Sequence, residues 1–203
     1  MKILKLMFVA VISSFLMILS SNALEKRIGV AAGYTNVEGD GRETLKDSSK
    51  VASKTVDEST LIPSIFAEIA SDNGLGLGIE YVPGTASIGT GSRADDDAET
   101  TAGNKASAEI DGLTSVYVIK TFDNGMFLKA GMTQTDVITK ETLGTGSTYG
   151  NKSVDGTLIG LGMHKVRDNG TFFRASAEYT DYDSFKLTSG VADAVTGKKN
   201  VIN

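Results

Sequence analysis

The tripeptide Asp-Asn-Gly occurs three times in this chain, each time between two runs of alternating apolar residues. Asn and Gly adopt the backbone conformations that tight turns require, so each copy predicts the turn of a β-hairpin. Long segments rich in Ser, Thr, Gly and Asp separate the copies. Short turns at one end and long polar loops at the other are typical of an up-and-down antiparallel β-barrel. The copies are Asp72-Asn73-Gly74, Asp123-Asn124-Gly125 and Asp168-Asn169-Gly170.

Length and composition fit one β domain. The 203 residues suffice for a single sizeable domain, and 23 Gly against two Pro suit an all-β chain with Gly in its turns. A net charge of −5 argues against nucleic acid as a partner. The absence of Cys excludes disulfides and thiolate metal sites. Mean hydropathy near zero does not separate a soluble protein from a membrane barrel, in which only every second strand residue meets lipid.

Residues 1–23 have the features of a helical secretory signal peptide. Lys2 and Lys5 precede an apolar run from Leu6 to Leu19, and Ser21-Asn22-Ala23 offers small residues for cleavage. A transmembrane helix is the alternative, but the run is shorter than the roughly 20 residues that a span needs. We therefore expect a signal peptide at 1–23 and a barrel domain at 24–203. Any later crossing of a membrane would use strands, because no later window is apolar enough for a helix.

The alternating pattern predicts seven strands and three long loops. The loops are expected at residues 39–59, 86–105 and 139–153. The expected strands cover about 27–37, 60–70, 75–84, 110–122, 126–137, 156–167 and 171–182.

The turns decide which side chains share a face. A three-residue loop that ends in a left-handed Gly pairs the residue before Asp with the residue after Gly. This register sorts the first and third hairpins into an apolar face and a face of small or charged residues, whereas a two-residue turn would mix them. In the second hairpin Lys120 falls on the apolar face, as Lys165 does in the third, near the turn where a long side chain reaches water. The apolar face carries Leu75, Leu77, Ile79, Tyr81, Leu128, Ile159, Leu161, Met163, Phe173 and Tyr179.

The opposite face predicts the interior of a small barrel. It is rich in Gly and carries few charges, but of both signs, as a buried ionic network requires. We expect Glu68 or Glu80 to pair with Arg174 or Lys129, and we expect the apolar face to meet lipid. The alternative is a soluble lipocalin-like barrel with its apolar face inside. The predicted interior polar network consists of Glu68, Glu80, Lys129, His164, Arg174 and Glu178.

The leader, the Asp-Asn-Gly hairpins and the segment Gly74–Tyr81 resemble the small eight-stranded outer-membrane barrels, the OmpA/OmpX-like outer membrane protein beta-barrel domain group. The resemblance implies a Gram-negative outer membrane, contact with its lipid and lipopolysaccharide, insertion by the barrel-assembly machinery, and a plugged or narrow lumen. Members of that group typically end in a strand that closes on an aromatic residue, but this chain ends at Lys198–Asn203. We therefore expect a transmembrane barrel of eight strands, of which about seven are present and the eighth is truncated. The alternative is that 195–202 forms a short closing strand.

Few residues suggest a catalytic or metal-binding site. His164 is the only histidine, and its expected place near a turn, away from the long loops, favours a structural role. The acidic run Asp95, Asp96, Asp97 and Glu99 is a weak candidate for Ca²⁺, but it lacks EF-hand spacing, so we expect a solvated loop and no metal or cofactor.

The expected function is structural: a scaffold, favoured as a monomer, that presents polar loops outside the cell. A narrow passive pore is the companion hypothesis. An outer-membrane enzyme, either a protease or a lipid-modifying one, and a soluble secreted carrier remain as alternatives.

Overall fold

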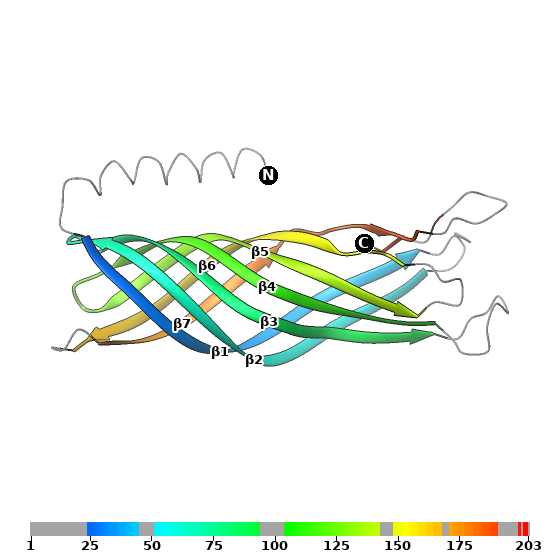
Figure 1. The fold of residues 1–203 in the computed structure, drawn as a ribbon, viewed down its shortest axis with the longest axis horizontal. Coiled ribbons are helices and arrows are strands. Elements are labelled where there is room, and N and C mark those ends of the chain that lie inside the picture. The colour runs from blue at the N-terminus through cyan, green and yellow to red at the C-terminus, as the bar shows by residue number, and fades with distance from the viewer. Residues whose placement is uncertain are drawn as a thin grey trace.

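Seven long antiparallel strands make up most of the computed structural model (Figure 1). It describes residues 24–44, 51–93, 104–142, 148–167, 171–190, 199 and 201–202. The expected signal peptide, the third turn (Asp168–Gly170) and the acidic run from Asp95 lie outside these ranges. The strands are β1 (Leu24–Thr44), β2 (Val51–Ser71), β3 (Leu75–Arg93), β4 (Asn104–Thr121), β5 (Met126–Thr142), β6 (Lys152–Val166), β7 (Phe172–Tyr182), and two short strands, β8 (Leu187–Thr188) and β9 (Val201–Ile202).

The seven long strands form one meander, and the full sheet order is β7-β6-β5-β4-β3-β2-β1-β9-β8. The sheet curls into a half-barrel, and the side chain of Arg174 on β7 reaches Glu68 on β2 across the concave side. Among the described residues, β1 and β7 do not pair with each other. The all-β class, the antiparallel meander and the seven strands predicted from the sequence are confirmed.

The first two turns have the conformation that a three-residue loop requires. Gly74 and Gly125 adopt φ values of 79° and 82°, in the left-handed region where a Cβ would clash. The Gly74 amide donates to the carbonyl oxygen of Ser71 at 2.8 Å, and the Gly125 amide to that of Phe122 at 2.9 Å. The third hairpin has the same register, because the Arg167 amide donates to the carbonyl oxygen of Thr171 at 2.8 Å. These turns fix which side chains face inward on each hairpin.

The predicted long loops were wrong over most of the described positions. Residues 39–44 and 51–59 continue β1 and β2, 86–93 and 104–105 continue β3 and β4, and 139–142 and 152–153 belong to β5 and β6. The curved sheet, called the wall below, has polar residues on its outer side in these parts of the strands. The alternation of apolar and polar residues therefore stops there, although the strands continue. Polar cross-strand contacts accompany this part of the ladder, including Thr55 Oγ1 to Asp40 Oδ1 and Lys140 Nζ to Glu109 Oε2, both at 2.7 Å.

The core lies on the concave side of the sheet. Tyr117, Ile119 and Phe127 on β4 and β5 form a cluster of large, fully buried apolar side chains there. Glycines on neighbouring strands make room for the rings: a methyl group at Gly78 would overlap the ring of Tyr117, and one at Gly162 would overlap that of Phe127. The Gly-rich inner face therefore accommodates large aromatic side chains inside a narrow curve.

The last described residues lie beside β1. Val201 and Ile202 of β9 pair antiparallel with Thr44 and Glu43, and also with β8. Only these two residues of the possible closing strand at 195–202 are described as a strand, and 191–198 lie outside the described ranges. A full eighth strand is therefore not seen in the described part of the chain.

Candidate functional site

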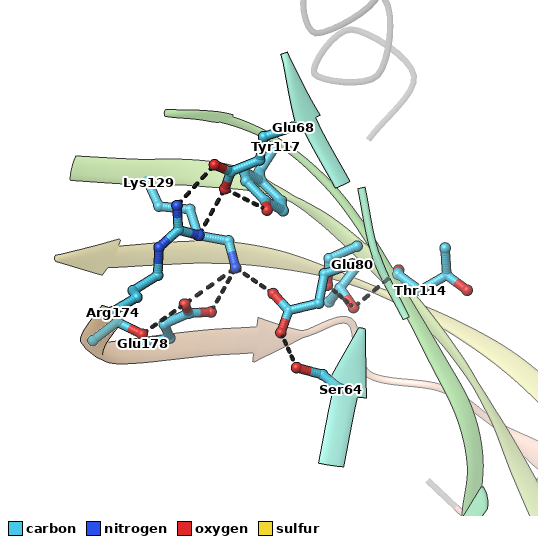
Figure 2. Close-up of polar contacts among 11 residues, drawn as sticks. Ser64, Glu68, Glu80, Thr114, Tyr117, Lys129, Arg174 and Glu178 are labelled. Atoms are coloured by element: carbon cyan, nitrogen blue, oxygen red, sulfur yellow. Dashed lines mark hydrogen bonds and ion pairs between the residues drawn. The ribbon is translucent and has the colours of Figure 1, made fainter. Parts of the chain in front are cut away.

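The charged side chains of the inner face form two connected groups toward the turn end of the strands (Figure 2). Every second residue of a strand faces inward, so one charged residue each from β2, β3 and β5 and two from β7 meet on the concave side. Each group is centred on one buried ionic contact.

The first group is centred on Glu68, whose side chain is fully buried. Arg174 Nη1 and Nη2 donate to its two oxygens, each at 2.7 Å, in a bidentate pair. The hydroxyl of Tyr117 donates to Glu68 Oε1 at 2.8 Å, and Arg27 Nη1 lies 3.9 Å from Oε2. Both carboxylate oxygens are thus paired.

Aromatic rings surround the guanidinium of Arg174. Its central carbon lies 4.7 Å from the ring centre of Phe66, 4.9 Å from that of Phe127 and 5.6 Å from that of Phe172. Cation–π attraction is strongest where water is excluded, as it is here. The rings and Glu68 together fix the orientation of this arginine.

The second group is centred on Lys129, which is almost fully buried. Its Nζ lies 2.6 Å from Glu80 Oε2 and 2.9 Å from Glu178 Oε2, and 4.1 Å from the ring centre of Tyr117. Ser64 Oγ donates to Glu80 Oε1 at 2.6 Å. Tyr117 therefore lies between the two groups. The two groups contain Glu68, Glu80 and Glu178 with Lys129 and Arg174, and Arg27 adds a third cation whose closer partner is the half-exposed Glu25, at 2.6 Å.

Five of the six residues predicted for the interior network meet in these two groups: Glu68, Glu80, Lys129, Arg174 and Glu178. The expected pairs form as Glu68 with Arg174 and Glu80 with Lys129. His164 takes no part in either group. Its half-buried ring stacks near Phe127, with ring centres 6.3 Å apart and an interplanar angle of 26°, and lies 6.4 Å from Phe172.

Sequence reasoning omitted three participants: Arg27, Tyr117 and Ser64. A signal was available for Arg27, because it stands next to the outward Ile28 and must therefore face inward. Tyr117 was assigned to the inner face, but no pattern indicated that its hydroxyl would reach Glu68. The contact joins β4 to β2, which depends on the curvature of the sheet.

The arrangement supports a structural role for these charges. The carboxylate oxygens of Glu68, Glu80 and Glu178 all accept hydrogen bonds from arginine, lysine, tyrosine or serine side chains. Within the described residues, no three His, Asp or Glu side chains are grouped to hold a metal ion. The weak calcium candidates Asp95, Asp96, Asp97 and Glu99 lie outside those residues, so their prediction is untested.

The outer, convex face of the sheet carries exposed apolar side chains, in contrast to the charged inner face. Ile28, Val30 and Tyr34 on β1 are 83, 82 and 78% exposed. The ladder puts the outward residues of neighbouring strands side by side, so the exposed apolar side chains form a band. Monomeric soluble proteins rarely expose a continuous apolar patch of this kind. Of the residues predicted to face lipid, Leu75 and Leu77 are partly covered, and the others are exposed: Ile79, Tyr81, Leu128, Ile159, Leu161, Met163, Phe173 and Tyr179.

Comparisons with protein-family models, curated proteins and solved structures gave no match to this chain. In the described part of the chain no helix is long and apolar enough to cross a membrane.

Proposed function

We propose that this protein is an outer-membrane β-barrel with a structural role. The barrel anchors the polar loop ends of its strands, and the loops themselves, at the cell surface. The single observation that carries the proposal is the inversion of polarity across the sheet. Apolar side chains such as Ile159 and Leu161 are more than half exposed on the convex side, while Glu68 and Lys129 are buried on the concave side. Lipid stabilises such an outer surface, and pairing makes such an interior tolerable.

The proposal includes an eighth strand in the wall between β1 and β7. Unpaired backbone N–H and C=O groups in hydrocarbon cost several kcal/mol each, so an open edge would not persist there. β9 supports this position, because Val201 pairs with Thr44 in the antiparallel direction that such a strand would follow down β1.

The lumen of this barrel is filled rather than open. Eight strands leave an interior just wide enough for side chains, and the rings of Tyr117 and Phe127 with their ionic neighbours occupy it. A scaffold is therefore preferred to a passive pore. The soluble carrier is disfavoured because it would need its apolar face on the concave side. No described feature favours an enzyme.

Refolding into detergent micelles tests the proposal. The protein should remain monodisperse only with detergent, and the unboiled form should migrate differently from the boiled form on a denaturing gel, because a closed barrel resists unfolding by the gel detergent. A monodisperse detergent-free protein without a mobility shift would refute the membrane assignment. Planar-bilayer recording would then separate scaffold from pore: sustained single-channel conductance would overturn the filled lumen.

A further inference from the structure

The pairing between β2 and β3 covers only the part of the two strands next to their turn. The two strands contain 21 and 19 residues, yet they pair only from Ala70↔Gly76 to Ile65↔Tyr81, next to the turn. On their other sides, β2 pairs with β1 along its entire length, and β3 pairs with β4 as far as Arg93. Among the described strands, the interruption thus lies at the boundary between the β1–β2 and β3–β4 hairpins.

The two prolines of the chain lie at this interruption. In the β2–β3 register, paired residue numbers sum to 146, because Ile65 pairs with Tyr81 and Ala67 with Ile79. Continued by two residues, the same register places Pro63 directly opposite Pro83. Proline has no N–H and cannot donate to a ladder.

Both prolines stand at positions where a backbone N–H would otherwise donate across the β2–β3 boundary. In an antiparallel ladder, alternate residues direct both backbone groups toward the same neighbouring strand. The Thr121 amide donates to the carbonyl oxygen of Gly74, so even-numbered residues at the start of β3 face β4 and odd-numbered ones face β2. Pro83 therefore lacks a donor toward β2, and its opposite residue Pro63 lacks one toward β3. Neither proline removes a donor from β1–β2 or β3–β4, which agrees with the uninterrupted β1–β2 ladder.

Above the prolines, the two hairpins touch through side chains. Lys54 Nζ donates to the carbonyl oxygen of Thr90, and Val56 lies beside the backbone of Gly89. β3 also bends at this level, where its register with β4 shifts between Val82 and Thr85.

We propose that Pro63 and Pro83 form a hinge that ends the β2–β3 ladder and lets the β1–β2 hairpin move against the β3–β4–β5 wall at the loop end. Below the hinge, six backbone pairs and the Ser64–Glu80 hydrogen bond keep the wall continuous. Two hairpins joined by side chains open at lower free energy than two strands joined by a ladder. The hinge goes beyond the proposed function and does not depend on the membrane assignment.

Amide hydrogen exchange, measured residue by residue on the refolded protein, tests the hinge. It can be measured in buffer or in detergent micelles, whichever the protein folds in. We call the unpaired boundary between β2 and β3 above the prolines the split. Amides of β2 that face the split should exchange at least about tenfold faster than the alternate amides that face β1. Equal protection of both sets would overturn the hinge. The split-facing amides are those of Ser53, Thr55, Asp57, Ser59 and Leu61, and the β1-facing amides are those of Val56, Glu58, Thr60 and Ile62.

The double variant Pro63→Thr/Pro83→Thr restores both donors with a residue that favours strands. Protection of the Leu61 amide should rise about tenfold or more, toward that of Ile65, and the alternation should fade near the former prolines. Ala32→Thr is the matched control, because it adds the same side chain opposite position 63 on β1 without adding a donor to the split. An unchanged Leu61 amide in the double variant would refute the hinge. Should the double variant not fold, the wild-type alternation alone decides.

Discussion

The Glu68–Arg174 pair gives the sharpest test of how the interior is held together. Arg174→Met removes two 2.7 Å charge-assisted hydrogen bonds and leaves a fully buried carboxylate with the Tyr117 hydroxyl and Arg27 at 3.9 Å. Removing one partner of a buried ion pair typically costs about 3–5 kcal/mol of folding free energy. Glu68→Met should cost a similar amount, because it leaves Arg174 charged among three aromatic rings without its anion.

The double variant Glu68→Met/Arg174→Met should be far less destabilised than the two single changes together. Two methionines fill the space with flexible apolar side chains, and replacing a buried pair by apolar groups is often neutral. The Tyr117 hydroxyl still loses its acceptor, which costs about 1–3 kcal/mol. We therefore expect a favourable coupling energy of about 3 kcal/mol or more between the two positions.

Urea unfolding in micelles, followed by the gel mobility shift, measures these free energies, since the chain has no Trp to report unfolding. The cycle requires all four proteins to show one two-state transition. Lys165→Met is a suitable control, because it removes an exposed cation near a turn and should change stability by less than about 0.5 kcal/mol. Additive single and double costs would refute the reasoning, as they would mean that Glu68 and Arg174 do not depend on each other.

Two further predictions concern the two faces of the wall. Gly78→Val should destabilise the protein by about 1–3 kcal/mol, because its side chain would overlap the Tyr117 ring. Gly33→Val is the control and should be almost neutral, because no neighbouring atom lies closer than 4.0 Å to the added Cβ. Equal urea midpoints for the two variants would contradict the tight inner packing. Ile159→Arg should cost about 2–4 kcal/mol in lipid bilayers, whereas Gln134→Arg on the outward polar part should not; an Ile159→Arg protein as stable as wild type in bilayers would count against a lipid-facing band.

The sequence predicted the faces of the hairpins better than the lengths of the strands. The Asp-Asn-Gly turns set a register, and a period of two then assigns each side chain to one side, so the inward Glu68 and the outward Leu161 follow directly. Strand length could not be predicted in this way, because residues such as 51–59 are mostly polar and carry no regular alternation of apolar and polar side chains. Their strand conformation comes from backbone pairing with β1 along its entire length.

The site was predicted in its charges but not in its full set of contacts. The need to balance buried charges selects Glu68, Glu80, Lys129 and Arg174 once the inner face is known. Contacts across the curve are different: Tyr117 to Glu68 joins residues 49 positions apart in the sequence, and Arg174 to Glu68 joins residues 106 apart. These contacts depend on how strongly the sheet coils, which no local pattern encodes.

The length of the strands changes how the proposed scaffold presents its loops. Strands of a membrane barrel need about 9–11 residues to cross the apolar band, tilted by roughly 45°. The 21 residues of β1 extend about 70 Å along the strand and therefore about 50 Å along the barrel axis, against an apolar band of about 25 Å. About half of the wall then stands beyond the membrane, and the proline pair lies near the upper border of the apolar band, where Leu61 is still exposed and Ser59 begins the polar part. A hinge at this height would leave the membrane-embedded part rigid and confine movement to the two hairpins outside it.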